Sequence, residues 1–305
     1  MNSTPIAIFI FNRPDLTKLT IEQLSKSRPP LLYVFADGPR NKDEEPLCNK
    51  SRELFSDLPW DCKVYLNGET SNKGMVYQIK NGLDHVFSKH ETVLFMQDDQ
   101  LLSPSSYTFV NDLLIKYKDD ERIGHINLSN FNPNYTKDYN NSYFFSSHVK
   151  VWGFATWRRM WETYNISMPE WSYVDQNKLL NKFCSNSNEK RGIKKMFDLH
   201  CNNDDPWTWD YQWLFNCWNR DTLSITPSKN LCLDIGFERE DSSHNKGENP
   251  FTNPIELMNF PLMHPSELKR NINFDKELSN IICPSRLSNF NKRISRFFTI
   301  LKKAL

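Results

Sequence analysis

Two adjacent carboxylates, Asp98 and Asp99, follow the run VLFMQ, whose first four residues are typical of a buried strand. Like charges repel, so neither carboxylate is expected to be buried without a partner. Mg²⁺ and Mn²⁺ prefer oxygen ligands and often bind one or two carboxylates together with substrate phosphates and water. The pair could therefore hold such a cation, although taken alone it is more often the solvated end of a strand that opens a turn.

Two further apolar runs also end in polar groups. The run 6–11 ends at Asn12 and Arg13, and the run 31–36 ends at Asp37, which precedes a Gly-Pro turn. In a parallel sheet covered by helices, ligands gather outside the carboxyl ends of the strands. These side chains are therefore expected to converge with the acidic pair in one site.

Apolar runs alternate with amphipathic segments throughout residues 1–128. The segment after Gly74, for example, keeps one helical face apolar. This alternation predicts an α/β fold with a mainly parallel sheet flanked by helices. Residues 129–260 are less regular and rich in tryptophan, and we expect both halves to form a single catalytic domain over 1–260.

The composition argues against several classes of protein. The net charge is +1, from 38 basic and 37 acidic residues, so no overall field attracts nucleic acid. No apolar stretch is long enough to span a membrane. The seven cysteines form no C-x-x-C pair, which favours reduced thiols in the cytosol over a zinc site or a disulfide framework. Only nine glycines occur and no Gly-rich phosphate loop is present, so a phosphate ligand would need another neutralising group.

Short motifs occur along the chain in the order found in one family of enzymes. FNRPD, AD, SNKG and LFMQDDQLLSP lie in the first half, and WGFATW, TWDYQW and TPSKNLCLDIGF followed by SSH lie in the second. Over about residues 5–245 the chain resembles GT-A glycosyltransferases of the N-acetylglucosaminyltransferase I-like group, and more closely bacterial homologues labelled HlpA-like.

This resemblance implies a GT-A-like fold and a metal-dependent, inverting sugar transfer. The donor would be a nucleotide diphosphate sugar, with UDP-sugars favoured, and the group transferred would be hexosyl or N-acetylhexosaminyl. The acceptor would be a glycan or a lipid-linked glycan. Bacterial surface polysaccharide or lipopolysaccharide synthesis is the context that the resemblance implies.

The resemblance also assigns roles to the acidic run. The family motif is usually Glu-Asp-Asp, and its last acid, here Asp99, binds Mn²⁺ or Mg²⁺. Asp98 is then the second acid and reaches towards the ribose and uridine, while His244 of the SSH segment lies near the metal and phosphates. Gln97 stands where Glu is usual. Because an amide can still hydrogen-bond to a ribose hydroxyl, we expect altered nucleotide contacts and retained activity.

Other residues of the nucleotide-sugar site follow by position. Asp37 matches the family's base-contacting acid, Arg13 matches its N-terminal basic contact, and Lys73 lies in the loop that contacts the diphosphate. Asn12 ends the same apolar run as Arg13 and is grouped with them. Arg13, Lys73 and His244 could also be ordinary surface side chains.

Asp210 in TWDYQW is the candidate catalytic base. Inverting transfer needs a carboxylate on the acceptor side that takes the proton of the attacking hydroxyl. Three tryptophans surround Asp210 in the sequence, and apolar walls favour the basic carboxylate that this role needs. The same stretch could instead begin a core helix. Asp204 and Asp205 are the alternative bases.

Trp152, Trp157 and Trp209 are the candidate acceptor-side residues. Their rings have the size and amphipathic character that suits stacking on sugars. Gly153 would let a ligand approach the backbone closely between two of them. Core packing would explain the same rings equally well.

A C-terminal extension, 261–290, precedes a short basic amphipathic tail, 291–305. The apolar residues of the tail fall on one helical face, which suits a helix lying on an anionic bilayer surface. Docking of the tail on the protein's own core would explain the pattern equally well. With a lipid-linked acceptor, the tail predicts a cytoplasmic protein that is peripheral on the inner face of the plasma membrane.

Two other functions remain compatible with the sequence. A nucleotidyltransferase on a similar sheet would need a basic phosphate-activating loop near the N-terminus, for which FNRPDLTK offers little. A non-catalytic glycan-binding relative is favoured only by Gln97.

Overall fold

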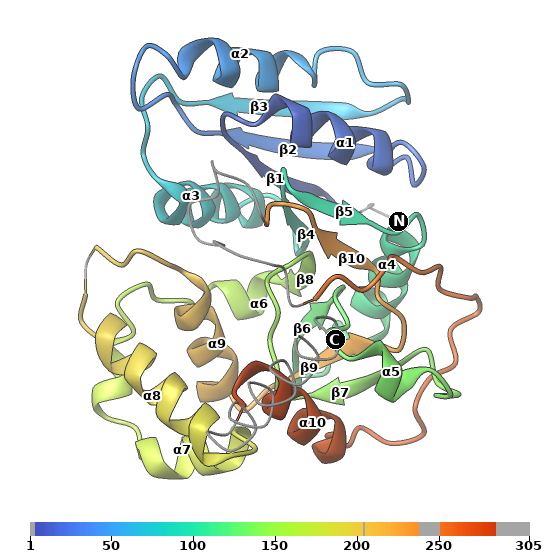
Figure 1. Cartoon of the computed structure of the whole chain (residues 1–305), viewed down its shortest axis with the longest axis vertical. Coiled ribbons are helices and arrows are strands. Elements are labelled where there is room, and N and C mark those ends of the chain that lie inside the picture. The colour runs from blue at the N-terminus through green and yellow to red at the C-terminus, as the bar shows by residue number, and fades with distance from the viewer. Residues whose placement is uncertain (1–3, 204, 238–250, 285–305) are drawn as a thin grey trace, which may run out of the picture.

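The computed structural model describes residues 4–203, 205–237 and 251–284, and this part of the chain is an α/β structure (Figure 1). Its main sheet has the strand order β3-β2-β1-β4-β8-β6-β9-β7, and β5 and β10 form a separate two-stranded ribbon. The strands are β1 (Ile6–Ile10), β2 (Leu31–Ala36), β3 (Lys63–Gly68), β4 (Thr92–Gln97), β5 (Gln100–Leu102), β6 (Ile123–Asn127), β7 (Tyr143–Ser146), β8 (Phe154–Trp157), β9 (Leu223–Pro227) and β10 (Cys232–Asp234).

Helices connect and cover these strands. They are α1 (Pro14–Leu24), α2 (Glu45–Glu53), α3 (Met75–Phe87), α4 (Ser106–Lys116), α5 (Pro133–Thr136), α6 (Arg158–Trp161), the 3-10 helix η1 (Pro169–Ser172), α7 (Gln176–Phe183), α8 (Ser187–His200), α9 (Asp210–Asn219) and α10 (Ile272–Ile282). The predicted α/β class, with a mainly parallel sheet flanked by helices, is confirmed.

The first four strands of the sheet are parallel, and the others are mixed. β1 pairs in parallel with both β2 and β4, and β2 pairs in parallel with β3. β8 is antiparallel to both β4 and β6, β9 is parallel to β6, and β7 is antiparallel to β9. Because β1, β2 and β4 are parallel neighbours, their carboxyl ends lie at one edge of the sheet.

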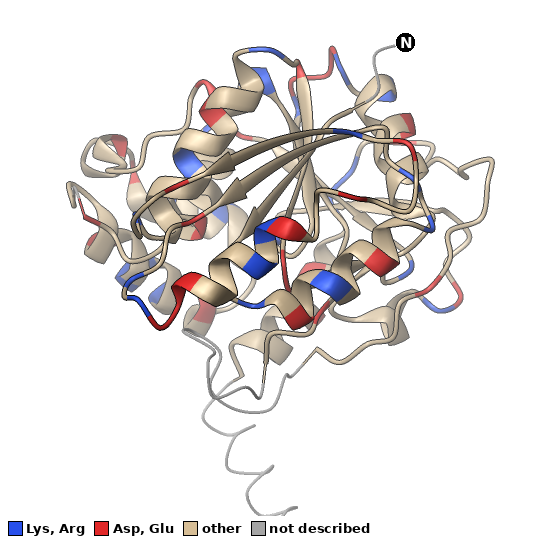
Figure 2. Cartoon of the chain, turned by 90° about the horizontal axis from the view of Figure 1, so that it is seen from above, with Lys and Arg blue, Asp and Glu red and all other residues tan. Residues whose placement is uncertain are grey.

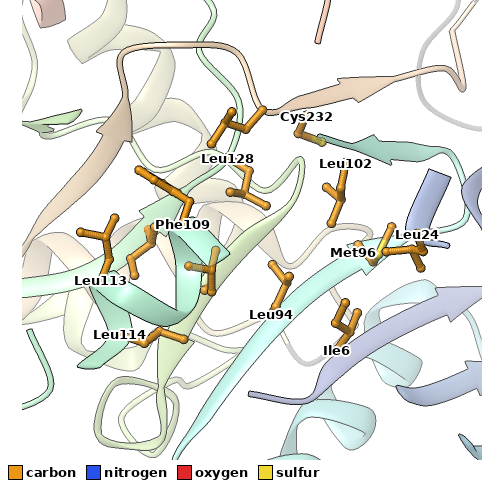
Figure 3. Packing of buried hydrophobic residues seen from close by; sticks show 14 of the residues in the cluster. Ile6, Leu24, Leu94, Met96, Leu102, Phe109, Leu113, Leu114, Leu128 and Cys232 are labelled. Atoms are coloured by element: carbon orange, nitrogen blue, oxygen red, sulfur yellow. The ribbon is translucent and has the colours of Figure 1, made fainter. Parts of the chain in front are cut away.

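Alternate residues of the parallel strands pack against helices on opposite faces of the sheet. On one face, Ile6 and Leu94 pack in a cluster with Leu24 of α1 and Phe109 of α4 (Figure 3). On the other face, Phe95 packs in a cluster that includes residues of α3, α6 and α9. Burial on both faces explains why these strands read as continuous apolar runs.

Part of the segment 261–284 also packs on the sheet. Phe274 of α10 contacts Phe144 of β7, with ring centroids 4.4 Å apart. Asp275 accepts a hydrogen bond of 2.5 Å from the hydroxyl of Ser146 in β7. The tail 291–305 lies outside the described residues. None of the described helices has the length and apolar composition of a membrane span.

Charges of both signs are interspersed over the described chain. Figure 2 shows Lys and Arg alternating with Asp and Glu along the helices nearest the viewer. Some form pairs at helical spacing, such as Lys80 with Asp84 at 2.6 Å and Lys194 with Asp198 at 2.7 Å. Exposed pairs of this kind contribute little to stability.

Candidate active site

A cleft of about 570 Å³ lies at the carboxyl ends of β1, β2 and β4. Its lining contains five carboxylates and two guanidinium groups: Asp37, Asp98, Asp99, Asp210, Asp234, Arg13 and Arg40. All of these except Asp234 and Arg40 were predicted from the sequence. Trp152, Trp207 and Trp209 also line the cleft. Among the described lining residues, carboxylates outnumber cations, so an anionic ligand would need a further positive charge there.

Arg13 bridges the acidic pair. Its Nη2 donates to Oδ1 of Asp98 at 2.5 Å, and its Nη1 lies 3.0 Å from Oδ2 of Asp99. The side chain of Asp98 is only 2% exposed, and those of Arg13 and Asp99 are 18% and 14% exposed. Burial alone would lower the pKa of Arg13, but the two carboxylates outweigh burial and raise that pKa. Burial also raises the pKa of Asp98, against the opposing charge of Arg13.

Asp234 lies beside Asp99 because β5 and β10 pair. Asp234 is opposite Gln100 in this antiparallel ribbon, and the N–H of Ile235 donates to the carbonyl of Asp99 at 2.8 Å. Burial and the charge of Asp99 raise the pKa of Asp234. Asp234 had no role in the sequence-based prediction. The signal that could have found it is an acid directly after a short apolar run, as at the acidic pair itself.

A divalent cation fits this corner of the cleft through Asp99. Oδ1 of Asp99 is buried and has no hydrogen-bond partner among the described residues, which is an expensive state that a ligand would relieve. Within the described chain no group of three or more His, Cys, Asp and Glu side chains is arranged to hold a metal by itself. Substrate phosphates and water would complete the shell, as is usual for Mg²⁺. His244, the other predicted metal ligand, lies outside the described residues.

Asp37, which directly follows β2, binds the SNKG loop (residues 71–74) that joins β3 to α3. Its Oδ1 accepts the N–H groups of Gly38 and Lys73, each at 2.8 Å. Its Oδ2 accepts the N–H of Gly74 at 3.0 Å and the side-chain amide of Asn72 at 2.9 Å. The carboxylate lines the cleft, but a nucleotide base would have to share or replace one of these bonds. The side chain of Lys73 is exposed and does not line the cleft.

Gln97 and Asn12 line the same part of the cleft. Oε1 of Gln97 accepts from Nε2 of Gln100 at 3.3 Å, and its Nε2 donates to the sulfur of Met75 at 3.8 Å. Nδ2 of Asn12 donates to Oε1 of Glu44 at 3.1 Å. The contacts of Gln97 are long, so a ligand hydroxyl could replace them at little cost.

Asp210 also lines the cleft, as the first residue of α9. The hydroxyl of Thr208 donates to its Oδ1, and among the described residues no hydrogen bond to its Oδ2 is formed. Of the alternative bases, Asp205 is exposed and does not line the cleft, and Asp204 lies outside the described residues.

Three tryptophans also line the cleft. Trp207 is 53% exposed and lines the cleft, whereas the ring of Trp209 is largely buried against Phe95, with centroids 5.2 Å apart. Trp152 is half-buried, lines the cleft and contacts Phe131, with centroids 4.7 Å apart. Trp207 was not singled out as an acceptor-side residue, although it is the most exposed ring of the three.

The predicted acceptor-side role of Trp157 is corrected to core packing. Trp157 is 3% exposed, lies in the main apolar cluster and does not line the cleft. It pairs with Thr92, the first residue of β4, whereas Gln97 at the other end of β4 reaches the cleft. Its indole N–H donates to the carbonyl of Leu114 at 3.2 Å. The physical reason is that β8 runs antiparallel to β4 and carries Trp157 away from the site.

No protein-family profile matches the chain, and no curated protein matches it. Among solved structures the chain is similar to UDP-glucose pyrophosphorylase complexed with UDP-glucose, at 8% identity and a TM-score of 0.36, over 74% of this chain and 90% of that one. It is similar to 4-diphosphocytidyl-2C-methyl-D-erythritol synthase from Anaerococcus prevotii, at 11% identity and a TM-score of 0.36, over 73% of this chain and 86% of that one. It is also similar to the galactosyltransferase LgtC in complex with donor and acceptor sugar analogs, at 7% identity and 0.34, over 70% of each chain.

Proposed function

We propose that the chain is a metal-dependent, inverting glycosyltransferase of the N-acetylglucosaminyltransferase I-like group. The donor is a nucleotide diphosphate sugar, with UDP-sugars favoured, and the acceptor is a glycan of bacterial surface polysaccharide or lipopolysaccharide. One observation carries the proposal: Asp99, whose Oδ1 has no partner among the described residues, and Asp210 line the same cleft. Sugar transfer needs both a site for the diphosphate and a carboxylate on the acceptor side.

On the nucleotide wall, Asp99 and the neighbouring Asp234 would hold Mn²⁺ or Mg²⁺. When bound, a divalent cation offsets the charge that develops on the departing diphosphate. Gln97, Asn12 and the SNKG loop held by Asp37 lie around the same corner and would orient the nucleoside.

Asp210 would take the proton of the acceptor hydroxyl. As the hydroxyl oxygen forms its bond to C1 of the sugar, the bond from C1 to the diphosphate breaks and its electron pair leaves with the nucleotide. The proton passes to Oδ2 of Asp210, which no described residue occupies, while Thr208 holds Oδ1. The exposed ring of Trp207 and the half-buried ring of Trp152 offer surfaces on which acceptor sugars could stack.

The rival activity, nucleotidyl transfer, has no use for a carboxylate base beside the acceptor. Asp210 lines the cleft and offers such a carboxylate, with Thr208 bound to its Oδ1. The described site therefore supports sugar transfer better.

The test is nucleotide release from a panel of UDP-, GDP- and CMP-sugars in the presence of Mn²⁺. The wild type should release UDP, and Asp99→Asn should lose this activity. Asp43→Asn is the matched control, because Asp43 is exposed and does not line the cleft. Pyrophosphate release from nucleoside triphosphates would instead identify a nucleotidyltransferase. Glycan binding without any turnover would identify a binding protein.

A further inference from the structure

Arg13 occupies the position in which a cation on the acidic pair would be expected. One guanidinium group contacts both carboxylates, at 2.5 Å to Asp98 and 3.0 Å to Asp99. All three side chains are largely buried. In this state a cation of the chain itself offsets part of the charge of Asp98 and Asp99, and the described carboxylates do not form a ready metal site.

The backbone of Arg13 is held independently of its guanidinium. Arg13 is the N-cap of α1, and Pro14 follows at the first helical position. The carbonyl of Arg13 accepts the N–H of Thr17 at 3.0 Å and the hydroxyl of Thr17 at 2.9 Å. The side chain can therefore change partners by rotation alone, without moving the helix.

Two features indicate that Arg13 would release Asp99 and keep its ion pair with Asp98. Asp98 holds Arg13 at the shorter distance and also accepts the N–H of Phe11 at 3.2 Å, so it is fixed from two sides. Asp99 holds Arg13 through Oδ2 only, while its Oδ1 has no partner in the described chain. A diphosphate offers the planar guanidinium a bidentate partner of higher charge than one carboxylate.

We propose that Arg13 is an exchangeable internal cation, which leaves Asp99 for the diphosphate of a bound nucleotide and so opens Asp99 to Mn²⁺ or Mg²⁺. This inference rests on the proposed function, since it names the order of events in that same site. Nucleotide and metal should then bind with positive coupling, and linkage requires that each raises the affinity for the other by the same factor. Metal alone should bind weakly, because it must compete with the guanidinium.

The test is Mn²⁺ affinity, measured by electron paramagnetic resonance and calorimetry on the full chain, without nucleotide and with saturating UDP. Arg13→Gln should bind Mn²⁺ alone more tightly than the wild type, by a factor in the usual range of site coupling, roughly 5- to 150-fold. Its gain in Mn²⁺ affinity on adding UDP should be smaller by a similar factor. UDP binds Mn²⁺ directly as well, but that contribution is common to all variants and cancels in the ratio.

Arg40→Gln is the matched control, because Arg40 also lines the cleft but pairs with Glu44. Its Mn²⁺ affinity without nucleotide should equal that of the wild type. Arg13→Lys is the second variant, should the Gln variant fail to fold. A lysine keeps the charge beside Asp98 but cannot bridge two carboxylates with a planar fork, so its Mn²⁺ affinity should also exceed that of the wild type.

The outcomes separate the two proposals. Equal Mn²⁺ affinity in the wild type and the Arg13 variants, or no Mn²⁺ binding in any of them, would overturn the exchange. A wild type that turns over no nucleotide sugar would overturn the proposed function instead. The comparison of Mn²⁺ affinities without nucleotide would still decide the role of Arg13, because it requires no turnover.

Discussion

Trp152 lies just before the short strand β8 and Trp157 is its last residue, so the two rings lie at opposite ends of this strand. Trp152 lines the cleft, whereas Trp157 pairs with the first residue of β4 and packs in the main apolar cluster. The two rings therefore offer a matched pair of variants. They test whether a ring that lines the cleft affects transfer while a ring in the core affects stability.

Trp157→Ala should reduce the free energy of unfolding by about 3–5 kcal/mol, the usual cost of removing a large buried aromatic side chain. Trp152→Ala should cost less stability, because its ring is only half-buried, and should lower the rate of transfer to acceptor at unchanged UDP affinity. Urea unfolding, UDP calorimetry and transfer rates measure the three quantities. The reverse pattern, with transfer lost only in the Trp157 variant, would contradict these roles.

Asp210→Asn should retain nucleotide binding and lose transfer. An asparagine oxygen can still accept from Thr208, so the fold and the nucleotide wall should be unchanged, while the proton acceptor is gone. We expect the transfer rate to fall about 10²- to 10⁴-fold, the usual contribution of a general base. Asp205→Asn is the control, since Asp205 precedes the same helix but is exposed and away from the cleft. If transfer is unchanged in Asp210→Asn, another group is the base.

The stability of the fold should fall as the pH falls below about 6.5, and His125 should contribute much of this loss. His125 is fully buried: its Nδ1 accepts from the indole N–H of Trp213 at 3.1 Å, and its Nε2 lies 3.0 Å from the carbonyl of Lys150, to which it donates. Protonation would place a second N–H against the indole N–H. Burial accordingly lowers the pKa of His125 to about 3.

The lowered pKa of His125 fixes the direction in which stability changes with pH. The neutral form is favoured in the folded state, so its contribution is complete above the unfolded pKa of about 6.5 and is lost as the pH falls towards 3. Each pH unit in this window should cost about 1.4 kcal/mol from this residue alone. Urea unfolding at several pH values measures the slope. It should flatten in His125→Gln and persist in His85→Gln, whose ring is half-exposed on α3.

The pattern of the sequence alone determined the α/β class and pointed to the end of β4 as a site. Apolar runs that are continuous, and not alternating, indicate strands buried on both faces, and the acids that end such runs must lie at the sheet edge. These are local signals, set by the spacing of residues along a few turns or one strand. They were sufficient to place Arg13, Asp37, Asp98 and Asp99 around one cleft.

Tertiary structure alone decided which groups those acids meet. Asp234 lies beside Asp99 because the β5–β10 ribbon joins distant parts of the chain, and nothing in either segment specifies the other. The pairing of Arg13 with Asp98 and Asp99 likewise depends on the parallel register of β1 and β4. Strand direction separated Trp152 from Trp157. Contacts of this kind join residues that are distant in sequence, so the local spacing of residues along the chain does not predict them.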